Sequence, residues 1–103
     1  MPLSKAKLFD EYYQSIALTG RALAHPARVQ IIDLLSQYQQ CKNVELTGVL
    51  GLSVASINNH VKKLEEAGIV EVVYADNYMQ IRLNPVALNG AEQFIRSQLG
   101  AAG

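Results

Sequence analysis

The sequence has few of the features that mark secreted or membrane proteins. Its 103 residues include one cysteine, Cys41, so no disulfide framework can form within the chain, and a reducing cytoplasm is the expected location. No apolar run approaches the roughly 20 residues that cross a bilayer, so no membrane association is expected. Charged residues break up the first apolar stretch, and no signal peptide is predicted; they are Lys5, Lys7, Asp10 and Glu11.

The chain also lacks an excess of charge of either sign. Nine basic and nine acidic residues give a formal net charge of zero. This balance argues against a strong nonspecific nucleic-acid binder, because neutralisation of phosphates supplies most of such binding. A zero net charge is compatible with a dimer that recognises one specific DNA site through a local cationic patch. No cluster of His, Cys, Asp and Glu and no glycine-rich phosphate loop is present, so we expect no enzyme, metal or cofactor.

The clearest local pattern lies between Ser53 and Gly68. Ser53 is a good N-cap, because its hydroxyl can accept a bond from an amide of the first helical turn. Ile57, Val61 and Leu64 follow at helical spacing and form one apolar stripe. Gly68 is suited to a left-handed helix cap. The pattern predicts a helix that buries one face.

The opposite face of this helix is unusual for a solvated surface, where Glu and Lys would dominate. It carries small and amide side chains near the N-terminus and a cation further along. Such a face suits a helix whose first turns enter the major groove of DNA. With a short helix at 45–50 and a turn at Gly51, residues 45–68 read as a helix-turn-helix. The candidate DNA-contacting residues here are Ser53, Val54, Ala55, Ser56, Asn58, Asn59, His60 and Lys62.

Residues 69–84 change to a period of two and predict a β-hairpin, with Asp76-Asn77 as its turn. The two-residue turn pairs Val70 with Leu83, Val72 with Ile81 and Tyr74 with Met79, which makes one face apolar. The other face sets Glu71 against Arg82. Arg82 is therefore assigned first to this ion pair and second to DNA, as a wing residue.

The remaining segments read as helices at 3–24, at 26–38 and at 85–99, with a loop at 37–43. Pro26 and Pro85 each fit a first helical position. In the second helix we expect Val29, Ile32 and Leu35 to be buried. His25 is expected to cap that helix and Arg28 to tie helices together. The fold class is mainly α with a β-hairpin, in a single winged helix-turn-helix domain over 1–103.

Three motifs resemble the ArsR-type winged-helix repressors, a bacterial family of small homodimeric regulators that often respond to metals. They are ALAHPAR at 22–28, LGLS at 50–53 and NHVKKLEEAGIV at 59–70. Together they place residues 20–84 in the family's order. The resemblance implies a homodimer built from the first and last helices, 1–24 and 85–99, which fits the apolar character of both end segments.

The resemblance fails where the family binds metals. Its cysteine-containing segment before the third helix is Lys42-Asn43-Val44-Glu45 here, with Cys41 one place ahead. The alternative site on the last helix needs Asp, His and Glu, and 85–99 offer only Glu92. One thiol cannot complete a four-ligand site, so no metal site is predicted. Arginines common in the family's recognition helix and wing are also replaced, by Asn59 and by the nearly neutral tip at 75–78.

Two functions remain open. The first is a sequence-specific repressor that binds double-stranded DNA as a homodimer on an inverted-repeat operator. Its inducer is unknown and is not expected to be a thiolate-bound metal, and an unknown small-molecule effector is left open. The second is a winged-helix module that binds a protein partner and has little or no DNA binding, which the zero net charge and the wing tip favour. Cys41 is either a redox switch or an inert loop residue.

Overall fold

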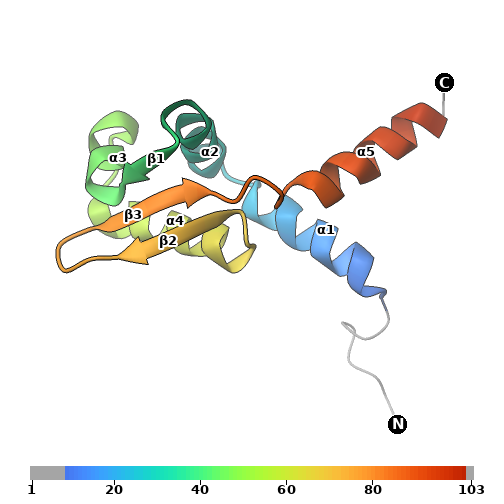
Figure 1. The fold of residues 1–103 in the computed structure, drawn as a ribbon, viewed down its shortest axis with the longest axis horizontal. Helices are drawn as coiled ribbons and strands as arrows, with labels where there is room; N and C mark the ends of the chain where they lie inside the picture. Colours follow the sequence, from blue (N-terminus) through green and yellow to red (C-terminus); the bar gives the residue numbers. More distant parts are fainter. Residues whose placement is uncertain (1–8, 102–103) are drawn as a thin grey trace, which may run out of the picture.

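The computed structural model describes residues 9–101 of the chain. Over this range five helices and three strands follow one another (Figure 1). No helix among the described residues is both long and apolar enough for a membrane span. The elements are α1 Glu11–Ala22, α2 Pro26–Tyr38, β1 Gln40–Lys42, α3 Asn43–Leu50, α4 Val54–Glu66, β2 Val70–Tyr74, β3 Met79–Leu83 and α5 Asn89–Ala101.

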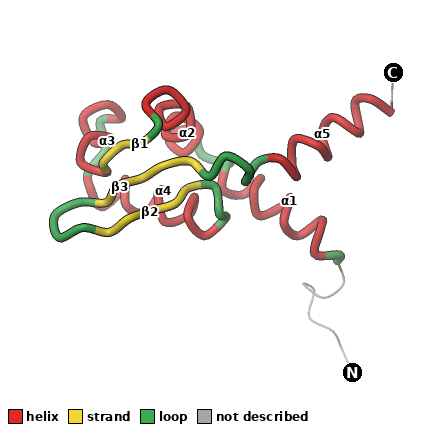
Figure 2. Tube along the Cα trace, viewed as in Figure 1, coloured by secondary structure: helices red, strands yellow, loops and turns green. Residues whose placement is uncertain are grey.

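The core is formed where α2, α3 and α4 pack around the sheet (Figure 2). The predicted stripe of α4 is confirmed, because Ile57, Val61 and Leu64 are all fully buried. Burial of one such side chain stabilises the fold by about 1.5–3 kcal/mol. The stripe therefore fixes which face of α4 turns inward. The other fully buried large side chains are Ile31, Leu35, Leu46, Ile69 and Ile81.

Both ends of α4 follow the prediction. The Ser53 hydroxyl oxygen accepts a hydrogen bond from the amide of Ser56 at 3.1 Å, and α4 begins at the next residue, Val54. Gly68 has a φ of 75°, a left-handed conformation that costs a glycine little. The Ile69 amide then bonds the carbonyl of Leu64 at 2.9 Å, which closes the helix and starts the chain toward β2.

The hairpin has the predicted register. Val70 pairs with Leu83, Val72 with Ile81 and Tyr74 with Met79. On the other face a Glu71 carboxylate oxygen lies 2.8 Å from an Arg82 guanidinium nitrogen. The Ala75 amide donates to the Tyr78 carbonyl at 2.9 Å across the tip, in keeping with the predicted two-residue turn.

The sheet has a third strand, which the sequence did not predict. β1 pairs antiparallel with β3, so the strand order is β1-β3-β2. This stretch was predicted to be a loop, and the third helix was predicted from Glu45 instead of Asn43. The three residues of β1 are polar or only partly buried and show no apolar alternation. Their strand conformation depends on the backbone edge that β3 offers, not on their own side chains.

Three other predictions require correction. Val29 is half exposed, at 50%, while Ile31 is buried, because the inward face of α2 is the Ile31 and Leu35 stripe. The first helix begins at Glu11, where Asp10 caps it by accepting from the Tyr12 amide at 3.0 Å; residues 3–8 of the predicted helix lie outside the described range. The last helix begins at Asn89, because residues 85–88 form turns.

The end helices α1 and α5 project from the same side of the fold, with α5 toward the upper right and α1 toward the lower right in Figure 1. They contact each other through Tyr12 and Phe94, whose rings meet edge to face with centroids 6.4 Å apart. Apolar side chains remain exposed on both helices and just before α1. These are Phe9, Tyr12, Tyr13, Leu18, Ile95 and Leu99.

Candidate nucleic-acid interface

The solvent-facing side of α4 presents the residues that the sequence singled out. Ala55, Asn59 and Lys62 are exposed and follow one another at helical spacing, so they share one face. Val54 and Ser53 are exposed at the start of the helix, and Ser56 is half-buried. The Ser53 oxygen accepts the capping bond, which leaves its O–H free to donate. This face combines small residues, one exposed amide and one cation.

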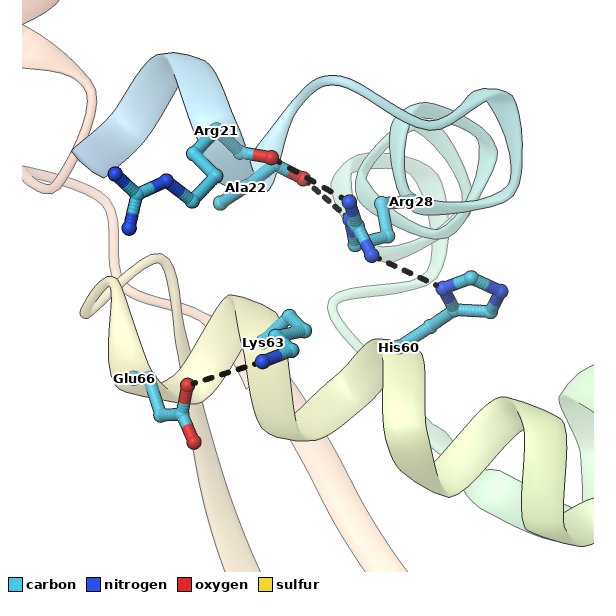
Figure 3. Close-up of polar contacts among 6 residues, drawn as sticks. All are labelled: Arg21, Ala22, Arg28, His60, Lys63 and Glu66. Atoms are coloured by element: carbon cyan, nitrogen blue, oxygen red, sulfur yellow. Dashed lines mark hydrogen bonds and ion pairs between the residues drawn. The ribbon is translucent and has the colours of Figure 1, made fainter. Parts of the chain in front are cut away.

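Lys62 and Lys63 differ in their surroundings. The Lys63 ammonium lies 3.9 Å from a carboxylate oxygen of Glu66 (Figure 3), which offsets its charge locally. No ion pair to Lys62 is found within residues 9–101. Lys62 is therefore the cation on this face of α4 that is available to a phosphate.

Asn58 is placed differently from Asn59. It is half-buried, and its Oδ1 accepts a hydrogen bond from Nδ2 of Asn43 at 2.9 Å. Part of its hydrogen-bonding capacity is thus used inside the fold. Among the two amides of α4, Asn59 has the exposed side chain.

His60 belongs to a cluster of basic groups behind the interface. Nδ1 of His60 lies 3.3 Å from an Arg28 guanidinium nitrogen (Figure 3 shows the Arg28 contacts). The His60 and His25 rings are tilted by 49° to each other, with their centroids 4.4 Å apart. Arg28 also donates to the carbonyl of Ala22 at 2.7 Å and of Arg21 at 3.4 Å. Arg28 thus joins α1, α2 and α4, as predicted. His25 caps α2 by accepting from the Ala27 amide at 3.0 Å, also as predicted.

This cluster makes stability depend on pH. Partial burial, then His25 and then Arg28, lower the pKa of His60 below its ordinary value. The unfolded chain therefore binds the proton more readily, and the free energy of unfolding should fall as pH drops through about 6.5 toward the folded pKa. Urea unfolding at pH 7.5 and 5.5 should show a larger loss for wild type than for His60→Gln, whose amide oxygen can still accept from Arg28. Equal losses in the two proteins would remove His60 as the cause.

The wing offers little unpaired positive charge for contact with DNA. Arg82 is exposed but paired with Glu71, and its guanidinium Nε also donates to that carboxylate at 2.9 Å. The tip between Ala75 and Tyr78 has no basic residue. A cation that the sequence analysis did not single out lies beside it, because the Lys42 ammonium sits 4.6 Å from the centre of the Tyr78 ring. No sequence signal links Lys42 to Tyr78, since β1 was not predicted.

Cys41 lies partly buried between α2 and α3, beside Glu45. Burial, and then the Glu45 carboxylate, raise the pKa of its thiol. A raised pKa reduces the thiolate fraction and with it the reactivity toward oxidants and metals. Across residues 9–101, no three His, Cys, Asp or Glu side chains gather where they could hold a metal ion.

A helix-turn-helix followed by an antiparallel hairpin beside its second helix defines a winged helix-turn-helix, a class of DNA-binding protein. Residues 25–72 match the family model described as bacterial regulatory protein, arsR family. This match covers 48 of the 103 residues and includes the helix-turn-helix, so this part of the chain is similar to a family of DNA-binding transcriptional regulators, which are not enzymes. None of the curated proteins matches the chain significantly in sequence.

Solved structures show the same fold at low sequence identity. An ArsR-like transcriptional regulator from Rhodococcus sp. RHA1 is 24% identical, with a TM-score of 0.75 over 90% of this chain and 86% of that one. A homodimeric winged helix-turn-helix DNA-binding domain from Mycobacterium bovis is 24% identical, with a TM-score of 0.67 over 99% and 90%. The antimony-specific repressor AntR is 16% identical, with a TM-score of 0.63 over 99% and 88%.

Proposed function

We propose that the protein is a repressor that binds an inverted-repeat operator as a homodimer. The α4 helix of each subunit enters a major groove, and the two grooves lie about one helical turn apart. Ala55 and Val54 allow close approach, Asn59 reads a base, and Lys62 holds a phosphate. The observation that carries the proposal is the exposed face of Ala55, Asn59 and Lys62 on a helix whose opposite face is locked in the core.

The remaining candidate residues take supporting roles. Ser53 and Ser56 supply hydroxyl groups at the leading turn, where the helix N-terminus also favours phosphate. Asn58 and His60 are held from behind by Asn43 and Arg28, so they approach DNA with fixed orientations. Arg82 meets DNA only by leaving its exposed pair with Glu71. Because exposed ion pairs contribute about 0–1 kcal/mol, this exchange costs little.

The exposed apolar surface of α1 and α5 supports the homodimer. Phe9, Tyr13, Ile95 and Leu99 would be covered if a second copy packed its end helices against these. Exposed apolar surface is typical of interaction sites where it is contiguous, and scattered single residues would need no partner. The Mycobacterium bovis relative of the same fold is described as homodimeric.

We propose that the effector is a small molecule and not a thiolate-bound metal. The chain supplies one thiol, Cys41, and its raised pKa disfavours the thiolate that metals bind. A bacterial regulator of this kind would act in the cytoplasm, where its DNA is.

A mobility-shift experiment separates this function from a protein-binding module. DNA from upstream of the protein's own coding region is the first probe, because repressors of this kind often control their own promoter. We expect a shifted complex that resists a large excess of unrelated duplex. Equal competition by unrelated duplex, or no shift in low salt, would contradict a sequence-specific regulator and favour the protein-binding alternative.

A further inference from the structure

Asn43 is a buried polar residue at the start of α3, and the proposed function uses it only as the partner of Asn58. Its side chain is 4% exposed. Its Oδ1 accepts a hydrogen bond from the Met79 amide at 2.9 Å, and its Nδ2 donates to Oδ1 of Asn58 at 2.9 Å. One side chain therefore joins α3, the recognition helix α4 and the wing strand β3.

The direction of these bonds is fixed by the backbone. The Met79 amide can only donate, so Asn43 must present its oxygen to it. The side-chain amide nitrogen of Asn43 then faces Asn58. Because this nitrogen can only donate, Asn58 must accept through its oxygen. The orientation of both amides thus follows from one backbone N–H. The group of Asn58 that is not committed to Asn43 is its NH₂.

The position of this link matters for recognition. Met79 is the first residue of β3 and directly follows the wing tip, and Asn58 lies one residue before Asn59 on α4. A buried, fully satisfied polar link holds its partners in one arrangement, because each alternative leaves a desolvated group unpaired. Asn43 therefore sets the spacing between the two elements that would contact DNA.

We propose that Asn43 is a positioning residue for DNA recognition, which fixes α4 against the wing and leaves Asn58 as a hydrogen-bond donor. The proposal rests on the proposed function of α4. Bidentate pairing with adenine needs both an oxygen and a nitrogen of the amide. The oxygen of Asn58 is turned toward Asn43, and its NH₂ is the group left free of that bond, so adenine pairing falls to Asn59, and Asn58 meets an acceptor on DNA.

Two substitutions separate positioning from simple stability. Asn43→Leu keeps the number and branching of the side-chain heavy atoms but breaks both bonds. Asn43→Asp keeps an acceptor for the Met79 amide, and its second oxygen can accept from the Asn58 NH₂ after that amide turns over. The Asp variant therefore retains the link and reverses the polarity of Asn58. Leu46→Val is the matched control, because Leu46 is buried on the same helix and takes no part in the link.

The experiment selects bound sequences from random duplex DNA with each variant, at a temperature where urea unfolding shows all of them folded. We expect Asn43→Leu to lower the ratio of operator to nonspecific affinity at least tenfold, and Leu46→Val to leave this ratio unchanged. Asn43→Asp should bind a site altered at one base pair in each half. Exchange of the Met79 amide proton should be fast only in Asn43→Leu.

The outcomes are distinguishable. If wild type enriches no sequence, the proposed function fails and the positioning role fails with it. If wild type enriches an operator and Asn43→Leu has the same ratio of operator to nonspecific affinity as Leu46→Val, only the positioning role is wrong. An Asn43→Asp variant with the wild-type site would show that the orientation of Asn58 does not matter for recognition.

Discussion

Replacing Ile95 with glutamate is expected to convert the protein into a monomer and to reduce its affinity for the operator by at least about 100-fold. Ile95 is 57% exposed on α5 and follows Phe94, whose ring contacts that of Tyr12 on α1. A carboxylate placed in that interface must be desolvated without a partner. A monomer binds only one half-site. It therefore loses the increase in affinity, about 10²–10⁴-fold, that two linked binding sites provide.

Gln93→Glu is the matched control for Ile95→Glu. It adds the same charge to α5, roughly on the opposite side of the helix. Analytical ultracentrifugation gives the assembly state of each variant, and a mobility shift gives its affinity. We expect the control to remain dimeric and to bind as wild type does. If Ile95→Glu stayed dimeric with full affinity, the two end helices would not form the interface.

Asn59→Ala is expected to reduce discrimination between DNA sequences, whereas Lys62→Ala is expected to reduce affinity for all of them. Asn59 is exposed on the face of α4 assigned to base reading, so its loss should cost roughly 1–3 kcal/mol of discrimination at one base pair per half-site. Lys62→Ala should weaken binding to every sequence. It should also reduce the slope of log K against log salt by about one for each subunit.

The neighbouring Lys63→Ala provides the control for Lys62→Ala. Lys63 is paired with Glu66, so its removal should change the salt slope less. Titrations of operator and unrelated duplex at several salt concentrations measure both quantities. The same uniform loss in Asn59→Ala and Lys62→Ala would mean that reading and anchoring are not divided between these two residues.

The parts of the fold that the sequence predicted are those with a local pattern. Ile57, Val61 and Leu64 recur at helical spacing, and Ser53 and Gly68 flank the helix at its two ends, so α4 could be placed within two residues. The two-residue turn at Asp76-Asn77 fixed the register of the hairpin, because a slip by one residue would move its apolar side chains to the other face.

The parts that could not be predicted depend on distant neighbours. β1 is a strand because β3 offers it a backbone edge, and its polar residues carry no signal of their own. In α2 several faces are apolar, so the choice of Ile31 over Val29 is made by what packs against it. Pro85 fits a helix start, but the chain forms turns before α5 begins at Asn89.

The same distinction holds for the candidate interface. The exposed positions of Ala55, Asn59 and Lys62 follow from the periodicity of α4 alone. The bond from Asn43 to Asn58 joins residues fifteen positions apart, and no local pattern in the sequence links the two. The contact between the Lys42 ammonium and the Tyr78 ring could not be predicted either, because the two residues are far apart in the sequence.

Selection of bound sequences from random duplex DNA, with the wild-type protein, tests most directly whether two copies of α4 read DNA together. We expect an imperfect inverted repeat whose half-site centres lie about 10–10.5 base pairs apart, on one side of the duplex. Enrichment of a single unrepeated half-site, or of no sequence at all, would contradict it.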